Sequence, residues 1–214
     1  RAVVAHGEHG VGRVQQQHGV LEQALLIGVV LGDAHLAEVL DREAICLPLG
    51  RATIHVVAHS LGVTIARRAI LGGLENDSNG SAYDIGAPLT NSVDAFIGIA
   101  GANLGLASCT FATTAACGDE LGLYPGTWTN GELDDQSTLL TTLNSAEHYE
   151  GQRVYAIWGE SDGLLGQDTL LDCLLYGENT CQIPGQDDEY NEYLNHFDIR
   201  DETVSTQLRF LRGD

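Results

Sequence analysis

Two segments of this chain combine a continuous apolar run with a polar turn at its end. The first run starts at Ile54 and ends at Ser60, and the apolar residues after it recur at helical spacing. The second run covers residues 155–158 and reaches its turn just before Asp162. Residues 25–30 form a third candidate strand, and candidate helices lie at residues 34–47, 137–144 and 201–211. Apolar strands that alternate with helices predict an α/β protein with a mostly parallel central sheet flanked by helices.

The turn at Ser60 has the form of a nucleophile elbow. The stretch Ala58-His59-Ser60-Leu61-Gly62 places a small residue two positions before the serine and another two positions after it. The elbow needs small residues there because its backbone is strained and a bulky side chain would collide with the strand or the helix. Gly-flanked serines also occur by chance, but here a β-branched strand precedes the turn and a helix follows it. Ser60 is therefore the candidate nucleophile.

An acid and a histidine follow Ser60 in the order that the α/β-hydrolases use. Asp162 lies just beyond the apolar run at residues 155–158, and His196 precedes a predicted helix. A neutral imidazole can take the proton of a serine hydroxyl that attacks an acyl carbon, so His196 is the candidate base. A buried carboxylate fixes the tautomer of that imidazole, which gives Asp162 its candidate role.

Other acids and histidines compete for these roles. Two further acids follow Asp162 on a segment whose spacing indicates a solvated helix face, Asp168 and Asp172. Three histidines fit structural or exposed positions better than a catalytic one: His55, His59 and His148. Strand geometry points the ring of His59 away from Ser60, so we expect a packing role for it.

From Thr53 to the C-terminus the chain resembles the class 2 lipases, small secreted α/β-hydrolases that include minimal bacterial lipases with an Ala-His-Ser-x-Gly elbow. The likeness rests on the elbow and on residues 87–90, 93–103, 122–124, 149–151, 161–162, 182–185 and 194–196. It implies an α/β-hydrolase fold with the nucleophile at Ser60, the acid at Asp162 and the base at His196. Residues 1–50 do not share the resemblance.

The oxyanion hole is where the sequence departs from this family. One donor is expected to be the backbone N–H of Leu61, the residue after the nucleophile. The second donor usually comes from a loop after an early strand, often one that follows His-Gly. The counterpart in this chain is Val3-Val4-Ala5-His6-Gly7-Glu8, which offers the backbone N–H of Glu8.

Composition changes abruptly near residue 50. Residues 1–50 contain no Ser, Thr, Asn, Phe, Tyr or Trp, whereas the rest of the chain is rich in Ser, Thr and Asn. Two interpretations stay open: an unusual N-terminal half-sheet, or sequence translated from the wrong frame in place of the family's first strands. We expect a single α/β-hydrolase domain over residues 1–214, with residues 1–50 either atypical or misread.

Residues 102–151 form a cap-like insertion between two predicted strands. Insertions at this place in α/β-hydrolases form a cap or a wall of the acyl pocket. Three apolar residues are candidates to line that pocket, Leu104, Leu106 and Phe111. Simple packing under the insertion is the alternative.

The charge balance excludes some partners. The ten basic residues are all arginine, and thirty acidic residues give a net charge of -20. Such a surface repels nucleic acid and anionic membranes, so we expect neither as a partner. The sequence also lacks an apolar span of about 18 residues, so we expect no stable membrane insertion. We expect a monomer whose partner is a lipid or ester substrate, which includes polymeric esters.

The five cysteines predict two local disulfides. Cys109 and Cys117 flank one short loop, Cys173 and Cys181 flank another, and Cys46 is left over. Two such bridges imply an oxidising, extracellular setting, so we expect a secreted protein although this chain shows no signal peptide. Free buried thiols are the alternative. We expect no metal and no cofactor, because no spacing matches a zinc site and residues 187–189 read as a solvated acidic loop rather than a calcium site.

The sequence thus predicts a secreted, cofactor-free serine esterase or lipase that works through an acyl-enzyme. An extracellular polyester depolymerase of the polyhydroxyalkanoate type uses the same triad and is the first alternative. A catalytically dead or incomplete α/β-hydrolase that acts as a binding protein is the second, and it applies if residues 1–50 supply no oxyanion donor.

Overall fold

A parallel β-sheet forms the centre of the computed structural model, which describes residues 24–28, 53–76, 82–129, 132–146, 148–165 and 179–214. Within these residues the sheet has five strands in the order β1-β2-β5-β8-β9, and every pair of neighbours is parallel. Their bounds are Ala24–Gly28 for β1, Ile54–His59 for β2, Val93–Ile99 for β5, Arg153–Gly159 for β8 and Asp188–Glu192 for β9. The mostly parallel sheet predicted from the apolar runs is confirmed.

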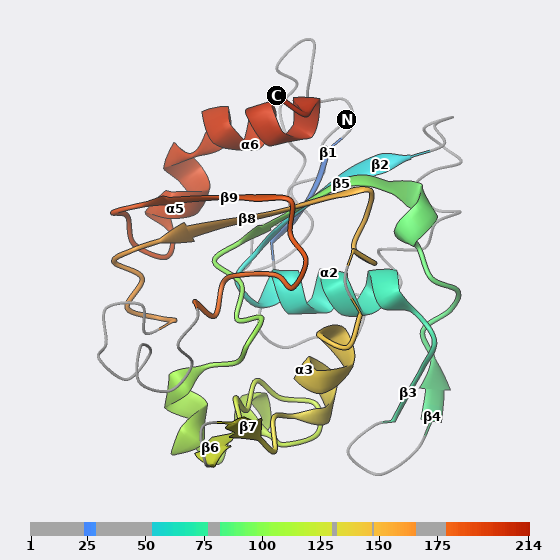
Figure 1. Cartoon of the computed structure of the whole chain (residues 1–214), viewed down its shortest axis with the longest axis vertical. Helices are drawn as coiled ribbons and strands as arrows, with labels where there is room; N and C mark the ends of the chain where they lie inside the picture. Colours follow the sequence, from blue (N-terminus) through green and yellow to red (C-terminus); the bar gives the residue numbers. More distant parts are fainter. Residues whose placement is uncertain (1–23, 29–52, 77–81, 130–131, 147, 166–178) are drawn as a thin grey trace.

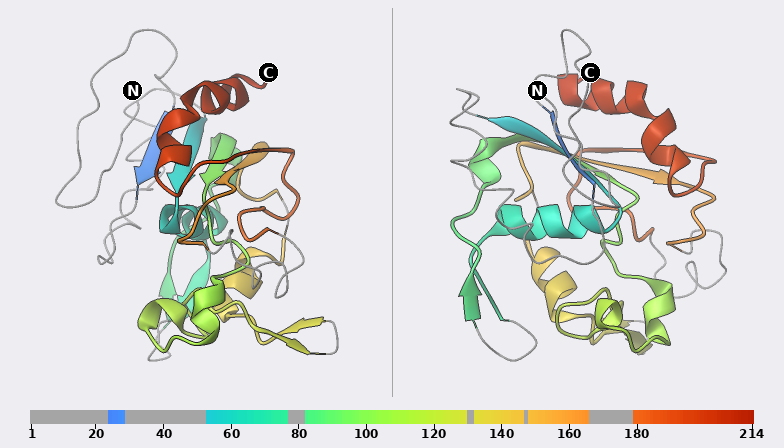
Figure 2. Two further views of the ribbon diagram at one scale, coloured as in Figure 1. Left: turned by 90° about the vertical axis from the view of Figure 1, so that its left-hand side faces the viewer. Right: turned by 180° about the vertical axis from the view of Figure 1, so that it is seen from behind.

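Helices cover both faces of this sheet. Helix α2 (Leu61–Leu71) lies on one face, and the pair α5 (Asp198–Glu202) and α6 (Val204–Arg212) lies on the other (Figure 1). Figure 2 shows the same arrangement from behind and from the side. None of the helices in the described ranges has the length and apolar character needed to cross a membrane.

The three central strands are buried along nearly their whole length. Val56, Phe96 and Ile157 are at most 1% exposed, one from each of β2, β5 and β8. Strands covered on both faces need apolar residues at every position, which is why the sequence shows continuous runs rather than alternation.

Strand β9 corrects one expectation. Residues 187–189 were predicted to form a solvated loop, but Asp188 and Glu189 begin an edge strand that pairs with Tyr155 and Ala156 of β8. The side chains of β9 are mostly exposed, and their charges are a common way to keep a sheet edge from pairing with another chain. The sequence hides this strand because an exposed edge needs no apolar pattern.

The described residues between β5 and β8 form short elements. These are the 3-10 turns η4 (Ala107–Thr110) and η5 (Ala115–Cys117), the hairpin of β6 (Thr127–Thr129) and β7 (Glu132–Asp134), and helix α3 (Thr138–Leu143). The predicted helix at residues 137–144 is confirmed, with the Ser137 hydroxyl capping it by accepting the N–H of Leu140. In Figure 1 this segment lies below α2, away from α6.

Two smaller features complete the described part. A second hairpin follows α2 and pairs β3 (Leu74–Asn76) with β4 (Ala82–Asp84). The 3-10 turn η3 (Thr90–Ser92) leads into β5.

In residues 1–50 the structure describes β1 alone, Ala24–Gly28, which lies beside β2 at one end of the described strand order. This strand overlaps the predicted one at residues 25–30. The helix predicted at residues 34–47 lies outside the described residues.

Candidate active site

Ser60 occupies the tight turn between β2 and α2. Its backbone has φ 59° and ψ -135°, a left-handed conformation that non-glycine residues rarely adopt. The Ser60 N–H donates to the carbonyl of Ile99 at 2.8 Å, and the Ser60 carbonyl accepts the N–H of Val63 at 2.9 Å. These two bonds hold the strained residue between the sheet and the helix, as an elbow requires.

The three residues predicted as a triad lie in hydrogen-bond contact. His196 Nε2 is 2.8 Å from Ser60 Oγ, and His196 Nδ1 is 2.7 Å from Asp162 Oδ2. The acid is fully buried and the histidine is 5% exposed, whereas Ser60 is half-buried. The arrangement can pass a proton from the serine hydroxyl to the imidazole while the carboxylate holds the imidazole in one orientation.

Asp162 is oriented by the backbone that follows it. Its Oδ1 accepts the N–H groups of Leu164 at 3.0 Å and Leu165 at 3.1 Å. These bonds leave Oδ2 for His196, so the two oxygens of the carboxylate have separate tasks.

His196 lies in the turn between β9 and α5. Asn195 closes this turn, because its Oδ1 accepts the N–H groups of Phe197 and Asp198, both at 3.0 Å. The turn also packs on the end of β8, where Ser161 N–H donates to the carbonyl of Leu194 at 3.3 Å. The acid and the base are thus held against each other by backbone contacts as well as by their side chains.

His59 contributes a contact that sequence reasoning missed. A packing role was predicted, and the ring does pack against His196, with centroids 4.8 Å apart. Its Nε2 also lies 2.8 Å from the carbonyl oxygen of His196. Burial lowers the pKa of His59 to about 4, so the ring is neutral at pH 7. No local signal in the sequence marks this bond, because its partners are 137 residues apart.

The N-terminus of α2 holds Leu61, the predicted first oxyanion donor. The backbone N–H of Leu61 opens the helix, and the first N–H groups of a helix have no partner within it. The positive end of the helix dipole also favours an anion there. Glu8, the predicted second donor, lies outside the described residues.

Two of the competing histidines, His55 and His148, make ion-pair contacts with other acids. His55 is buried in β2 with Nδ1 3.5 Å from Asp94 Oδ2, and the exposed His148 has Nε2 3.6 Å from Asp187 Oδ1. The competing acids Asp168 and Asp172 belong to the part of the chain that the structure does not describe.

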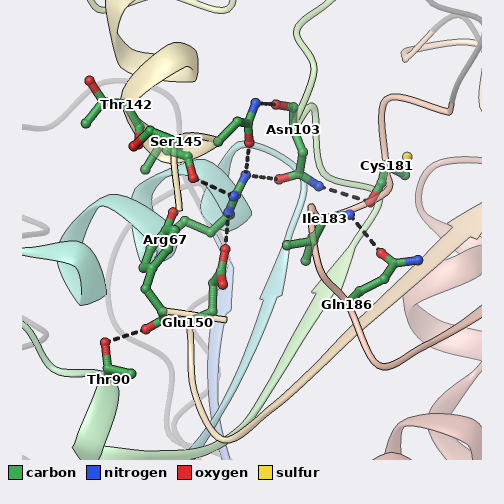
Figure 3. Close-up of polar contacts among 12 residues, drawn as sticks. Arg67, Thr90, Asn103, Thr142, Ser145, Glu150, Cys181, Ile183 and Gln186 are labelled. Carbon is green, nitrogen blue, oxygen red and sulfur yellow. Dashed lines mark hydrogen bonds and ion pairs between the residues drawn. The ribbon is translucent and has the colours of Figure 1, made fainter. Parts of the chain in front are cut away.

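A buried ion pair fixes α2 to the segment between β5 and β8. Arg67 Nε donates to Glu150 Oε1 at 2.8 Å, and both side chains are fully buried (Figure 3). The guanidinium also donates to Asn103 Oδ1 at 3.2 Å, Asn144 Oδ1 at 3.0 Å and the Leu143 carbonyl at 2.9 Å. The helix that follows Ser60 is therefore anchored on the face away from the sheet.

The residues predicted to line an acyl pocket differ in exposure. Leu104 and Leu106 are half-buried, but Phe111 is 81% exposed and so does not face an enclosed cavity. Two other apolar side chains closely follow the predicted acid and base in sequence and are exposed, Leu164 and Phe197. Apolar surface thus flanks both the acid and the base.

One of the two predicted disulfides is present: Cys109 is bonded to Cys117. The second predicted bridge involves Cys173, which falls outside the described ranges, as does Cys46, so that pairing stays a prediction. In the described part of the chain, no group of three or more His, Cys, Asp or Glu side chains is arranged to hold a metal ion.

Comparisons with known proteins give one family match. The sequence profile of the family "Lipase (class 2)" matches residues 43–209, and so starts somewhat earlier than the resemblance predicted from about residue 53. No curated protein matches the sequence. Among solved structures, alpha/beta hydrolase domain-containing protein 10 from mouse matches with 16% identity and a TM-score of 0.39. The match covers 79% of this chain and 64% of that one, so the chain spans less than two thirds of that protein's length.

Proposed function

The chain belongs to the class 2 lipase family, and we propose that it is a serine hydrolase that cleaves carboxylic esters through an acyl-enzyme intermediate. Membership supports a hydrolase of the lipase type with the α/β-hydrolase fold. The observation that carries the finer proposal is the continuous hydrogen-bonded path from Ser60 through His196 to Asp162, with lengths of 2.8 Å and 2.7 Å.

In the proposed acylation step, Ser60 Oγ attacks the ester carbonyl carbon and His196 Nε2 takes its proton. The negative charge on the carbonyl oxygen is then stabilised by the Leu61 N–H at the start of α2. Asp162 keeps the proton of His196 on Nδ1 and stabilises the imidazolium. The imidazolium returns its proton to the departing alkoxide, so an alcohol leaves and Ser60 carries the acyl group.

Deacylation repeats these roles with water as the nucleophile. His196 takes a proton from the water, the hydroxide attacks the acyl carbon, and the proton returns to Ser60 Oγ. The carboxylic acid then leaves. No step needs a redox group or a second substrate besides water.

The same observations bear on the alternatives. An assembled, buried acid–base pair next to the serine favours a working enzyme over a catalytically dead binding protein. A polyester depolymerase uses identical chemistry, so only the substrate distinguishes it. The Cys109–Cys117 bridge supports a secreted protein, because disulfides persist in oxidising compartments.

The proposal is tested by turnover of p-nitrophenyl acetate, butyrate and octanoate by the purified chain. Ser60→Ala is expected to lower kcat by at least about 100-fold with an unchanged circular dichroism spectrum, since only the nucleophile is lost. Ser205→Ala, an exposed serine on α6, is the matched control and is expected to retain full activity. A serine-directed phosphonate is expected to label Ser60 alone, as judged by peptide mapping.

Emulsified tributyrin and a film of poly(3-hydroxybutyrate) separate the two ester substrates. Hydrolysis of tributyrin without clearing of the film supports a lipase, and clearing of the film at a comparable rate supports the depolymerase. Ester turnover that survives in Ser60→Ala, or phosphonate on another serine, contradicts the proposal.

A further inference from the structure

His59 links the strand that carries the nucleophile to the residue that carries the base. The His59 side chain is 5% exposed, and its Nε2 lies 2.8 Å from the backbone carbonyl oxygen of His196. The residue after His59 is Ser60, whose Oγ lies 2.8 Å from His196 Nε2. Two neighbouring residues of the elbow therefore contact His196: Ser60 contacts its imidazole ring, and His59 contacts its backbone carbonyl.

The backbone of His59 is fixed on both sides. Within the sheet it is paired with Ile99 of β5 on one side and with Gly28 of β1 on the other. The following N–H, that of Ser60, donates to the Ile99 carbonyl at 2.8 Å. A hydrogen bond from the His59 ring thus ties the His196 carbonyl to a strand whose backbone is held on both sides within the sheet.

The His196 carbonyl accepts its hydrogen bond from a different kind of donor than the carbonyls of the residues before and after it. The carbonyl of Asn195 accepts the N–H of Ile199 at 3.1 Å, and that of Phe197 accepts the N–H of Arg200 at 3.2 Å. Those bonds belong to the start of α5. The carbonyl between them accepts from the His59 ring instead, so the base is tied to the elbow at the point where the turn enters the helix.

The protonation state of His59 suits this task. A carbonyl oxygen accepts only, so His59 Nε2 must carry the ring proton. The pKa of His59 is lowered to about 4, chiefly by burial; the hydrogen bond to the His196 carbonyl raises it, the charges of His196 and Arg200 lower it, and the charge of Asp162 raises it. The ring is therefore neutral near pH 7 and does not repel the imidazolium that His196 forms 4.8 Å away.

We infer that His59 is a positioning residue, which donates a hydrogen bond to the His196 carbonyl and thereby sets the distance from His196 Nε2 to Ser60 Oγ. The inference rests on the proposed function only in that the distance matters for proton transfer. Small displacements of a catalytic group can lower a rate by as much as about 100-fold.

Two substitutions separate the hydrogen bond from the packing of the ring. His59→Phe keeps an aromatic ring against His196 but removes the donor, whereas His59→Gln keeps an N–H donor near the position of Nε2. With p-nitrophenyl butyrate, we expect His59→Phe to lower kcat by about 10-fold to 100-fold while KM changes less than about twofold. We expect His59→Gln to recover most of that loss.

His55→Phe is the matched control, because His55 is also a buried histidine of β2 but lies four residues before His59. We expect it to leave kcat within about twofold of the parent, whatever its effect on the unfolding midpoint. A kcat for His59→Phe equal to that of the parent overturns the inference, and so does a His59→Gln variant as slow as His59→Phe.

Proton and nitrogen NMR of the unsubstituted chain test the inference without any turnover. We expect His59 to be neutral with its proton on Nε2 at pH 7, and the Nδ1 proton shared by His196 and Asp162 to give a far-downfield signal. That signal is expected to broaden or move in His59→Phe and to return in His59→Gln. A His59 ring protonated on Nδ1 overturns the inference, even if the chain hydrolyses esters. A correct tautomer in a chain without esterase activity supports the inference and counts against the proposed function.

Discussion

Gly159, the last residue of β8, lies directly against the carbonyl oxygen of Leu194. A β-carbon built on Gly159 would overlap that oxygen, and it would also come within 3.0 Å of the Leu194 carbonyl carbon. Leu194 begins the turn that carries His196, and Gly159 begins the turn that carries Asp162. The absence of a side chain at residue 159 is thus what lets the two turns approach until acid and base meet.

We therefore expect Gly159→Ala to lower kcat by about 100-fold, because the added methyl group must push the His196 turn away from Asp162. Gly163→Ala is the matched control, since a β-carbon there meets nothing within 4 Å and Gly163 lies on the same turn. The measurement is p-nitrophenyl butyrate turnover together with the unfolding midpoint. Equal activity in the two variants would contradict the steric argument.

Asp162→Asn is expected to lower kcat by about 10⁴-fold with little change in fold. Asn can still accept the N–H groups of Leu164 and Leu165 through one oxygen, so the turn stays in place. Its amide nitrogen then faces His196 Nδ1, which forces the imidazole into the tautomer that cannot accept the serine proton. Asp168→Asn is the comparison, and we expect a mild effect. A larger loss in Asp168→Asn would mean that Asp168 is the acid.

Arg67→Met is expected to lower the free energy of unfolding by about 3–5 kcal/mol, since it leaves the charge of Glu150 buried without its partner. Glu150 Oε2 already has no hydrogen-bond partner among the described residues, so nothing nearby replaces the guanidinium. The double variant Arg67→Met with Glu150→Gln is expected to cost less than the sum of the single variants, by about 0.5–3 kcal/mol. Urea unfolding of the four proteins measures this coupling, and strict additivity would show that the pair does not interact.

The sequence predicts the parts of this site that rest on local pattern. The elbow at Ser60 is marked by small residues and by the strand and helix around it, and Asp162 follows an apolar run that ends at a strand terminus. His196 follows from chain order. For Ser60 and Asp162 the deciding signal lies within about ten residues, where hydrophobic periodicity and turn chemistry are informative.

The remaining features depend on segments that meet only in the fold. Nothing near His59 indicates that its ring reaches the His196 carbonyl, and the packing of Gly159 on Leu194 is equally invisible. Helix α2 shows the same limit. Its apolar spacing predicts one buried face, yet Arg67 and Arg68 are also buried, because the segment between β5 and β8 and the Glu75 carboxylate cover them.

The stability of the protein is expected to fall as the pH is lowered from 6.5 to 4, in part because of His59. Its pKa is lowered to about 4 in the folded chain, so over this range the unfolded chain binds a proton that the folded chain does not. The stabilising contribution of His59 is fully present above pH 6.5, and it falls by about 1.4 kcal/mol for each pH unit between pH 6.5 and 4. Urea unfolding of the parent and of His59→Gln between pH 4 and 7.5 checks this. We expect a shallower pH dependence in the variant, and identical slopes would contradict the assigned shift.

The last prediction concerns the oxyanion hole and whether residues 1–50 provide its second donor. In the proposed mechanism Leu61 supplies one donor, and the loss of a single donor costs about 2.7–4 kcal/mol in the transition state, so a site with one donor is slow. Replacement of residues 1–50 by the first strands of a class 2 lipase with a His-Gly loop is therefore expected to raise kcat by about 10²–10³-fold. Strand β1 in that segment pairs with β2 up to the elbow, with Gly28 beside His59, so the replacement must supply an equivalent strand.

If the unaltered chain already turns over esters at about 10 s⁻¹, a rate typical of enzymes, residues 1–50 must provide a second donor and Glu8 becomes the first candidate. Two variants then test whether Glu8 is the donor: Glu8→Pro removes its backbone N–H, and Glu8→Ala keeps it. A loss of activity confined to the proline variant assigns the donor to Glu8. Equal activity in the two variants excludes Glu8.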